Sequence, residues 1–299
     1  MKLFLTGASG YIGGSIAARL VAQGHTVTGL IRDETKVEAL RACGIEPVIG
    51  TLDDHDVLAR EASAADGVVN TANADHLPSL EIMLAALEGS GKVLVHTSGS
   101  SVVGDDARGL SLSDHVFDED TPFVVAPGKR ARHALNQTVL AAAARGVRSV
   151  IVCPTLIYGM GTGLNRHSIQ VPFLVKEAQA NGMVRVVGKG LNRWSTVHID
   201  DLTDLYLLAL NKAPAGAFYF AENGEASFAE IGEAIAVRLG LGPVESVAAE
   251  DAAVQWGEAR AFYTYGSNSR VRALRAHREL GWRPRHESVL AWIASDMPL

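Results

Sequence analysis

The sequence has little cysteine and no long hydrophobic run, and each shortage excludes a class of protein. Cys43 and Cys153 are the only cysteines among 299 residues, so neither a disulfide scaffold nor a cysteine-rich zinc site can form. The longest apolar stretches, such as 139–144, fall far short of the roughly 20 residues that cross a bilayer. Gly7 interrupts the N-terminal apolar run, which argues against a signal peptide. We therefore expect a cytoplasmic protein in a reducing compartment, without membrane contact.

An excess of positive charge is also missing. The chain has 27 Lys and Arg against 33 Asp and Glu, a formal net charge of −6. Nucleic acids and anionic membranes require a basic face, so neither is an expected partner. The expected partner is a small-molecule substrate, and we expect the chain to be a monomer or a homodimer. Hydrophobic residues at 47% are enough for a sizeable core.

Strand and helix signals alternate through the first half of the chain. Short apolar runs predict strands at 2–6, 26–31, 46–49, 67–71, 92–97 and 148–153. Helical spacing of apolar residues predicts helices at 12–23, 35–42, 54–62, 78–88 and 128–145. Six buried strands separated by helices predict an α/β fold, a doubly wound parallel sheet covered on both faces.

The regular alternation of strand and helix signals ends after residue 158. A glycine-rich loop at 159–163 precedes helices expected at 171–181, 200–211 and 228–239 and strands expected at 184–187 and 216–221. The tail after residue 239 is mixed. We find neither an internal repeat nor a linker, so a second, smaller domain should be interleaved with the first.

The first predicted strand runs directly into a glycine-rich turn that opens a helix. The segment TGASGYIGG at 6–14 has a GxxGxxG pattern. Gly7 permits the tight turn, Gly10 lets the backbone approach a pyrophosphate, and Gly13 lets the helix pack against the strand. The helix N-terminus offers N–H groups to the phosphates. The residues predicted to bind the dinucleotide here are Thr6, Gly7, Ser9, Gly10, Tyr11, Ile12 and Gly13.

The end of the second strand indicates which dinucleotide binds. An enzyme that uses NAD usually has an acidic residue there to hold the ribose hydroxyls. Ile31 stands at that position and Arg32 follows it. A guanidinium suits the 2′-phosphate of NADP, and Lys36 could add charge. In the alternative, Asp33 holds the ribose and Arg32 is solvated. We predict NADP, with NAD as the alternative.

Six motifs in sequence order resemble the short-chain dehydrogenase/reductase superfamily, in its extended, epimerase/dehydratase-like branch. They are TGASGYIGG at 6–14, GTLDD at 50–54, VVNTAN at 68–73, VHTSGSSVVGD at 95–105, CPTLIYG at 153–159 and RWSTVHIDDL at 193–202. The resemblance implies a Rossmann domain and a smaller substrate domain, with the active site between them. We assign residues 1–164, together with about 199–224, to the Rossmann domain, and 165–198 and 225–299 to the substrate-binding part.

The resemblance also implies further cofactor contacts. They are Thr51 and Leu52 by the adenine, Ala72 and Asn73 by the ribose and pyrophosphate, and Thr97, Ser98 and Pro154 by the nicotinamide. All of these residues follow or end predicted parallel strands, and open α/β sheets bind ligands at the carboxyl ends of their strands.

The chain departs from the superfamily at the catalytic unit, which is a Ser or Thr with Tyr-x-x-x-Lys. The resemblance places Gly128 at the Tyr and Arg132 at the Lys, and no tyrosine lies between Tyr11 and Tyr158. The strict serine position falls on Gly99, with serines at 98, 100 and 101 around it. This departure resembles the atypical short-chain reductases, which include reductases with altered acid/base groups and non-catalytic redox sensors.

Five residues are candidates for the catalytic or proton-donating role: Ser98, Ser100, Arg132, His133 and Tyr158. A half-buried surface position is the alternative for His133, and packing under the glycine loop is the alternative for Tyr158. Arg193 matches an arginine that holds the substrate diphosphate in relatives that act on sugar nucleotides, or it forms a salt bridge. We expect no metal, because the acidic residues at 53–56 and at 200–201 are better explained as helix caps.

These features favour an NADP-dependent oxidoreductase that reduces a small carbonyl compound or an activated alkene. Hydride transfer is the chemistry of the cofactor, and a serine, a histidine or water can deliver the proton. The first alternative is an NAD(P)-binding sensor without turnover. The second is a nucleotide-sugar epimerase or dehydratase, and the missing tyrosine counts most strongly against it.

Overall fold

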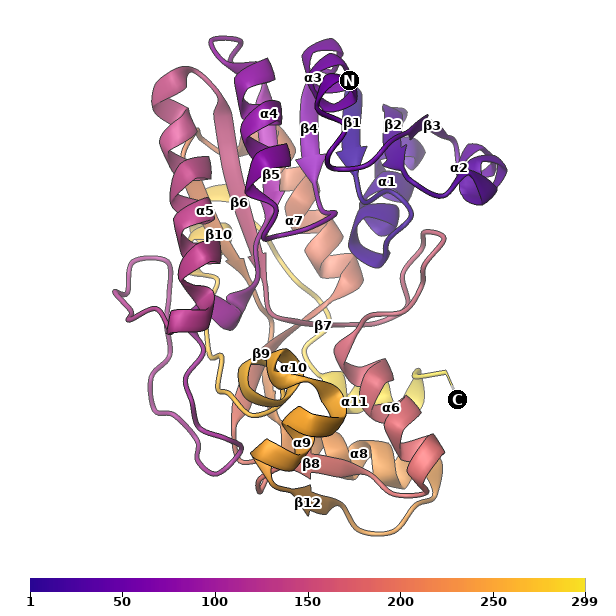
Figure 1. Ribbon diagram of the computed structural model, residues 1–299, viewed down its shortest axis with the longest axis vertical. Helices are drawn as coiled ribbons and strands as arrows, with labels where there is room; N and C mark the ends of the chain where they lie inside the picture. The colour runs from indigo at the N-terminus through magenta and orange to yellow at the C-terminus, as the bar shows by residue number, and fades with distance from the viewer. Residues whose placement is uncertain (299) are drawn as a thin grey trace.

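Seven parallel strands form the central sheet, in a computed structural model that describes residues 1–298 (Figure 1). Their order across the sheet is β10-β6-β5-β4-β1-β2-β3. The strands are β1 (Lys2–Thr6), β2 (Thr26–Ile31), β3 (Ile45–Ile49), β4 (Gly67–Asn70), β5 (Val93–Thr97), β6 (Arg148–Pro154) and β10 (Ala217–Ala221). This confirms the doubly wound parallel sheet. The sheet has one strand more than the six expected from the first half of the chain, because β10 pairs with β6.

Helices cover both faces of this sheet (Figure 1). They are α1 (Tyr11–Ala22), α2 (Val37–Ala42), α3 (His55–Ala64), α4 (Leu77–Leu87), α5 (Arg130–Ala141) and α7 (Ile199–Lys212). Helix α1 packs beside α7, and α3 packs beside α4. The single helix predicted over 128–145 is divided, because 3-10 turns at Pro127–Lys129 and Ala142–Arg145 flank α5. Gly146 ends the second turn in the left-handed conformation that favours glycine.

The second lobe lies below the carboxyl ends of the central strands in Figure 1. Its strands are β7 (Leu156–Tyr158), β9 (Arg193–His198) and β11 (Glu225–Ser227) in one sheet, and β8 (Arg185–Val187) and β12 (Glu245–Val247) in another. Its helices are α6 (Gln170–Asn181), α8 (Phe228–Leu239), α9 (Ala249–Trp256), α10 (Glu258–Tyr263) and α11 (Val289–Ser295). Ser227 and Glu230 form a capping box at the start of α8.

Each lobe has its own hydrophobic core. The first core contains the central strands and their helices, and Tyr158, Trp194 and Phe228 belong to the second. The segment 271–282, which the sequence assigns to the substrate-binding part, packs into the first core, and its Trp282 Nε1 donates a hydrogen bond to the Asp201 carbonyl at 2.8 Å. The exact domain boundaries stay a prediction. Within residues 1–298, no helix has the length and apolar character needed to span a membrane.

A row of polar side chains crosses the central strands near their carboxyl ends. Thr6, Asn70 and His96 are neighbours in register on β1, β4 and β5. Thr6 Oγ1 donates to Asn70 Oδ1 at 2.6 Å, and Asn70 Nδ2 lies 3.1 Å from His96 Nδ1. Burial lowers the pKa of His96 to about 4, so its ring is neutral and Nδ1 accepts from the Asn70 amide. The row fixes the spacing of three strands under the site.

The lowered pKa of His96 makes the stability of the fold dependent on pH. Below the ordinary histidine pKa of about 6.5, the unfolded chain binds a proton that the folded protein refuses, so stability falls as the pH drops from 6.5 toward 4. In His96→Gln this acid-induced loss should be smaller by about 2 kcal/mol between about pH 6.5 and 4.5 in urea unfolding experiments. The matched control is His167→Gln in an exposed loop, which should keep the original pH dependence. An equal acid sensitivity of His96→Gln and the unmodified protein would contradict the assignment.

Candidate cofactor and active site

The glycine turn after β1 is shaped by three close approaches. Gly7 has a φ of +79°, and a Cβ on Gly13 would lie 2.3 Å from the Gly7 carbonyl oxygen and 2.4 Å from Thr71 Oγ1. Gly13 therefore lets α1 pack on the turn itself and on the segment after β4. A Cβ on Gly10 would meet only the Gly7 carbonyl oxygen, at 3.1 Å. Gly10 caps α1 without a side-chain hydrogen bond, and the first turn has no acidic residue. The turn fits a dinucleotide pyrophosphate, because the N–H groups at the start of α1 face an open side.

The side chains near this turn have different partners. The Tyr11 phenol is buried, and it donates to the carbonyls of Tyr158 and Gly159 at 3.1 and 2.9 Å. Burial and the nearby Asp200 raise the pKa of Tyr11, so the phenol stays protonated. Only the backbone of Tyr11 remains for a phosphate. Ser9 and Ile12 are partly exposed in the same turn.

The glycine loop at 159–163 packs against the start of α1. A Cβ on Gly163 would lie 2.5 Å from Gly14 Cα, and one on Gly161 would lie 2.9 Å from the Tyr11 ring. The Thr162 N–H donates to Ser15 Oγ at 3.3 Å. The loop at 159–163, which connects the two lobes, is therefore fixed to α1.

The end of β2 presents a cation with no protein partner. Arg32 is exposed, and within residues 1–298 it forms neither a hydrogen bond nor an ion pair. Asp33 accepts from the Thr35 N–H at 3.1 Å and lies 3.3 Å from Lys36 Nζ. Hydrogen bonds from Thr35 and Lys36 hold the pKa of the Asp33 carboxyl below its usual range. Asp33 is therefore used within its own turn, and Arg32 stays exposed beside it.

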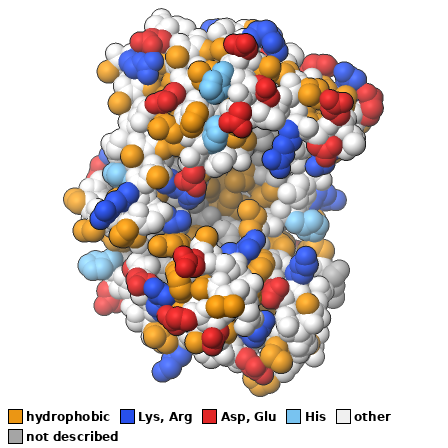
Figure 2. All heavy atoms as spheres, in the orientation of Figure 1, with side chains coloured by type: hydrophobic (Ala, Val, Ile, Leu, Met, Phe, Trp, Pro, Cys, Tyr) orange, Lys and Arg blue, Asp and Glu red, His pale blue; other side chains and the backbone are white. Residues whose placement is uncertain are grey.

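The loops after β3 and β4 hold the predicted adenine and ribose residues. Thr51 donates from N and Oγ1 to Asp54 Oδ2 at 2.6 and 2.9 Å, so Asp54 bonds backward instead of capping α3 with its side chain. Leu52 follows in the same loop. Ala72 and Asn73 are exposed after β4, and Asn73 Oδ1 accepts from the Asp75 N–H at 2.9 Å. Figure 2 shows a hollow between the two lobes, with hydrophobic side chains inside it and charged ones on its rim.

The residues predicted near the nicotinamide follow β5 and β6. Thr97 Oγ1 bonds with the Tyr206 hydroxyl at 2.6 Å, so this side chain points toward α7. Ser98 is buried, and its Oγ has no hydrogen-bond partner within residues 1–298. Ser100 Oγ is also buried and accepts a hydrogen bond from Ser269 Oγ at 2.9 Å. Pro154 ends β6 and is buried.

Arg132 forms a two-pronged ion pair that the sequence analysis did not predict. Its Nε donates to Asp75 Oδ1 at 2.7 Å, and its Nη2 donates to Asp75 Oδ2. Its Nη1 donates to Ser101 Oγ at 3.3 Å, and a Cβ on Gly99 would lie 3.0 Å from the same nitrogen. Hydrogen bonding from Arg132 holds the pKa of the Asp75 carboxyl below its usual range. The ion pair of Arg132 and Asp75 joins the loop after β4 to α5. It lies next to Gly99, the position at which the resemblance expects a serine.

Two of the predicted proton donors, Tyr158 and His133, are held by packing contacts. Tyr158 is 1% exposed, and its phenol donates to the His286 carbonyl at 2.9 Å within the second core. Burial raises the pKa of Tyr158, so the packing alternative describes this residue and the catalytic one does not. The ring of His133 packs edge-on against Phe123, with 5.8 Å between ring centroids.

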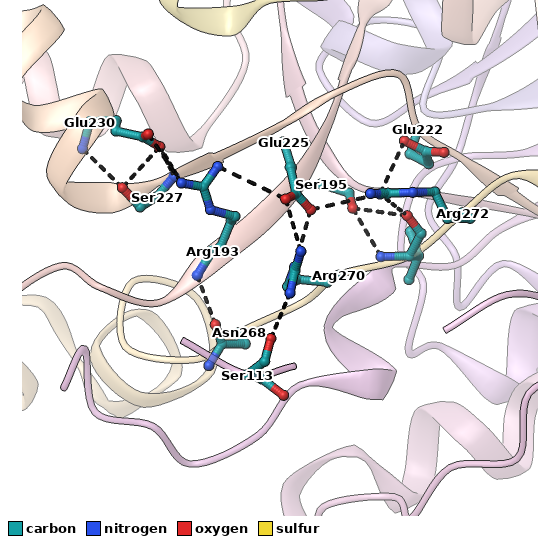
Figure 3. A network of polar contacts seen from close by, with 11 residues as sticks. Ser113, Arg193, Ser195, Glu222, Glu225, Ser227, Glu230, Asn268, Arg270 and Arg272 are labelled. Atoms are coloured by element: carbon teal, nitrogen blue, oxygen red, sulfur yellow. Dashed lines mark hydrogen bonds and ion pairs between the residues drawn. The ribbon is translucent and has the colours of Figure 1, made fainter. Parts of the chain in front are cut away.

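Arg193 takes part in a charged network of the second lobe (Figure 3). Its Nη2 lies 3.0 Å from Glu230 Oε2, and its Nη1 lies 3.9 Å from Glu225 Oε1. Arg270 and Arg272 also reach Glu225, at 2.9 and 3.7 Å. Of the two roles considered for Arg193, the geometry supports the salt bridge, because carboxylates already surround the guanidinium.

The histidine and acidic residues around α7 also serve the fold. The N-cap of α7 is His198, whose Nδ1 accepts from the Asp200 N–H at 3.2 Å, and not the acidic pair itself. Asp201 is buried, and its Oδ2 accepts from the His286 N–H at 2.9 Å and lies 3.0 Å from His286 Nδ1. The rings of His198 and His286 stack with centroids 3.8 Å apart. Cys153 is fully buried, and burial raises the pKa of its thiol to about 12.

A phenol from another part of the chain, that of Tyr263, lies beside the turn that precedes α5, and no local sequence signal indicates it. A Cβ on Gly128 would lie 2.7 Å from Tyr263 Oη, and Tyr263 comes from α10 of the second lobe. The Lys129 ammonium lies 5.2 Å from the centroid of the Tyr263 ring. Only the tertiary fold brings these residues together, so neither periodicity nor motif spacing could have identified the phenol.

Several known proteins are similar to this chain in sequence. An uncharacterized protein of Schizosaccharomyces pombe is 32% identical over 99% of both chains. The oxidase ucsJ of an Acremonium species is 33% identical over 95% of this chain and 92% of its own. A ketoreductase of Stigmatella aurantiaca, which acts on a farnesyl dihydroquinoline-1-oxide, is 28% identical over 75% of this chain and 69% of its own.

Solved structures share the fold. The dTDP-glucose 4,6-dehydratase DesIV of Streptomyces venezuelae, solved with NAD bound, has a TM-score of 0.78 and 22% identity, and the match covers 98% of this chain and 95% of that one. The sequence model of the NAD dependent epimerase/dehydratase family matches residues 3–219 of this chain. The chain therefore belongs to the NAD dependent epimerase/dehydratase family and is an enzyme of this NAD(P)-dependent group.

Proposed function

We propose that this protein is an NADP-dependent reductase of small carbonyl compounds or activated alkenes. The observation that carries the proposal is Arg32, an exposed guanidinium at the end of β2 that has no partner among residues 1–298, while Asp33 is bound to Thr35. A 2′-phosphate would neutralise the charge of Arg32. The carboxylate that could hold an unphosphorylated ribose is that of Asp33, and it is already bonded to Thr35. The ketoreductase relative supports reduction as the direction of the reaction.

Each part of the site has a role in this proposal. The N–H groups after Gly10 bind the pyrophosphate, and Arg32 binds the 2′-phosphate. The pair of Arg132 and Asp75 fixes α5 against the β4 loop, beside the carboxyl ends of β4 and β5. NADPH, when bound, supplies the hydride. The protein positions the acceptor carbon, excludes water and delivers a proton to the acceptor oxygen.

Two features weigh against a nucleotide-sugar epimerase or dehydratase. Arg193 is enclosed by Glu225 and Glu230, so a substrate diphosphate would have to displace an existing ion pair. The start of α5 has Gly128 where the family has its tyrosine base. Alcohol oxidation, with which such reactions begin, depends strongly on that base.

The compartment and the assembly state remain predictions. Cys43 and Cys153 are both free thiols, which is consistent with a reducing cytoplasm. We keep the expectation of a monomer or a homodimer.

The first prediction concerns turnover. The purified protein should oxidise NADPH in the presence of hexane-2,3-dione, 4-nitrobenzaldehyde, phenanthrenequinone or cinnamaldehyde, and it should leave UDP-glucose and dTDP-glucose unchanged. Absorbance at 340 nm and chromatography of the products measure the two results. NADPH binding without oxidation by any acceptor would favour the sensor alternative, and turnover of a sugar nucleotide would overturn the proposal.

The second prediction concerns the choice of dinucleotide. Arg32→Ala should weaken NADPH binding by about 1.5–3 kcal/mol, the scale of a charge-assisted hydrogen bond, and should barely change NADH binding. Fluorescence titration of the reduced cofactor measures both affinities. Arg60→Ala removes an exposed arginine of α3 and serves as the control, so its affinities should match the unmodified protein. Equal affinity of the unmodified protein for NADPH and NADH would refute the assignment.

The third prediction separates binding from folding in the glycine turn. Gly10→Val should fold, because Gly10 has an extended backbone conformation and its Cβ would have a single tight neighbour. It should abolish dinucleotide binding, because the side chain fills the approach of the pyrophosphate. Gly13→Ala should instead lower the melting temperature, because its Cβ would overlap the Gly7 carbonyl.

Gly242→Val is the matched control for Gly10→Val, since a Cβ on Gly242 would have no atom within 4 Å. Its melting temperature and its affinity for NADPH should remain those of the unmodified protein. Normal calorimetric affinity of a folded Gly10→Val protein for NADPH would show that the phosphates bind elsewhere.

A further inference from the structure

The position that a family tyrosine would occupy is not empty. A Cβ on Gly128 would lie 2.7 Å from Oη and 2.8 Å from Cζ of Tyr263. These distances are shorter than real Cβ contacts, so the Tyr263 phenol would have to shift from this position to admit a side chain at 128. The Tyr263 phenol of α10 therefore occupies the space in which a side chain at position 128, in the turn before α5, would begin.

The Lys129 side chain lies over the ring of this phenol. The Lys129 ammonium lies 5.2 Å from the Tyr263 ring centroid, and Arg132 follows one helical turn after Gly128. Burial and repulsion from Arg132 lower the pKa of Lys129 to about 8. A positive charge near a phenol favours the phenolate that remains after proton donation. Asp75 balances Arg132 through its bidentate ion pair, and the Lys129 ammonium is the cation that lies over the Tyr263 ring.

A cavity of about 470 Å³ opens beside the phenol. Its size lies within the range of sites for small organic ligands. Val125, Ala126, Pro127 and Phe262 form an apolar part of its wall, and Tyr263 lines it together with the charged residues Asp105, Asp106, Arg108 and Arg130. The cavity has room for a compact carbonyl compound, and the Tyr263 phenol reaches its wall.

We propose that Tyr263 is the proton donor of the reductase, a phenol supplied by the second lobe in place of the missing residue of α5. This proposal rests on the reductase function proposed above. Tyr263 donates its proton to the substrate oxygen while the carbonyl carbon accepts the hydride that NADPH supplies. The phenolic O–H bond and the C=O π bond break, and the new C–H and O–H bonds of the alcohol form. Lys129 stabilises the phenolate, and water returns the proton.

The other candidate donors are less suited to this step. Tyr158 and Ser100 already bond to His286 and Ser269. His133 packs on Phe123. Ser98 has no bonded partner for its Oγ within residues 1–298, so it is the competing donor that the experiment must distinguish.

The experiment compares Tyr263→Phe with the unmodified protein, using NADPH and hexane-2,3-dione. The variant should lose about 100-fold or more in kcat, since general acid catalysis typically contributes ~10²–10⁴-fold. Its affinity for NADPH, from fluorescence titration, and its melting temperature should stay unchanged. Tyr219→Phe is the matched control, because that phenol bonds to Glu279 at the far edge of the central sheet, and its kcat should be normal.

A second arm tests the position of the phenol without turnover. Tetranitromethane should nitrate Tyr263 in the protein alone, and saturating NADP⁺ with hexane-2,3-diol should reduce that nitration at least threefold, as measured by mass spectrometry. A third arm places the phenol back on the first turn before α5. Gly128→Tyr in a Tyr263→Ala background should recover at least tenfold in kcat over Tyr263→Ala alone.

The outcomes separate the two proposals. Near-normal kcat in Tyr263→Phe, a large loss in Ser98→Ala alone, or nitration that the ligands do not reduce would each overturn the role of Tyr263 while leaving the reductase function in place. If the unmodified protein reduces no acceptor, the reductase function itself fails, and the role of Tyr263 fails with it.

Discussion

The close approach of α1 to the turn before it is the constraint on which the site depends. Because Gly13 has no side chain, the helix rests directly on the Gly7 carbonyl and on Thr71. That contact aims the first N–H groups of α1 at the carboxyl edge of the sheet, where the strand order reverses beside β1. The same helix then meets the second lobe, since Gly14 touches Gly163 and Tyr11 holds the carbonyls at the end of β7. Cofactor binding and the joining of the lobes thus share one element.

Charge is distributed in two different ways around the cleft. In the second lobe, Arg193, Arg270 and Arg272 are compensated by carboxylates of the same lobe (Figure 3). On the Rossmann side, Arg32 lacks such a partner within residues 1–298. This contrast suits a molecule whose phosphates lie on the sheet and whose reacting part is uncharged.

The sequence predicted the parts of the fold that local patterns control. The seven strands of the central sheet and the helices that cover it were predicted within a few residues of their bounds, and the glycine turn was located fully, because each depends on its own short segment. The strand β9 and the helices α9, α10 and α11 were not predicted. The short strands β7, β11 and β12 have three residues each, too few for a period to show. Tyr158 was placed near the nicotinamide because it follows β6 closely, but β7 carries its side chain into the second core. The ion pair of Asp75 and Arg132 and the approach of Tyr263 join distant segments, and no single-segment pattern encodes them.

The contact between Tyr263 and the backbone at Gly128 also constrains how this protein can evolve. A side chain at position 128 and the Tyr263 phenol in its present place compete for the same space, so a gain at one position requires a shift or a smaller residue at the other. Each change made first would leave an intermediate with either two competing groups or none. Within a lineage the residues at the two positions should therefore change together, which couples the first turn before α5 to α10 of the second lobe.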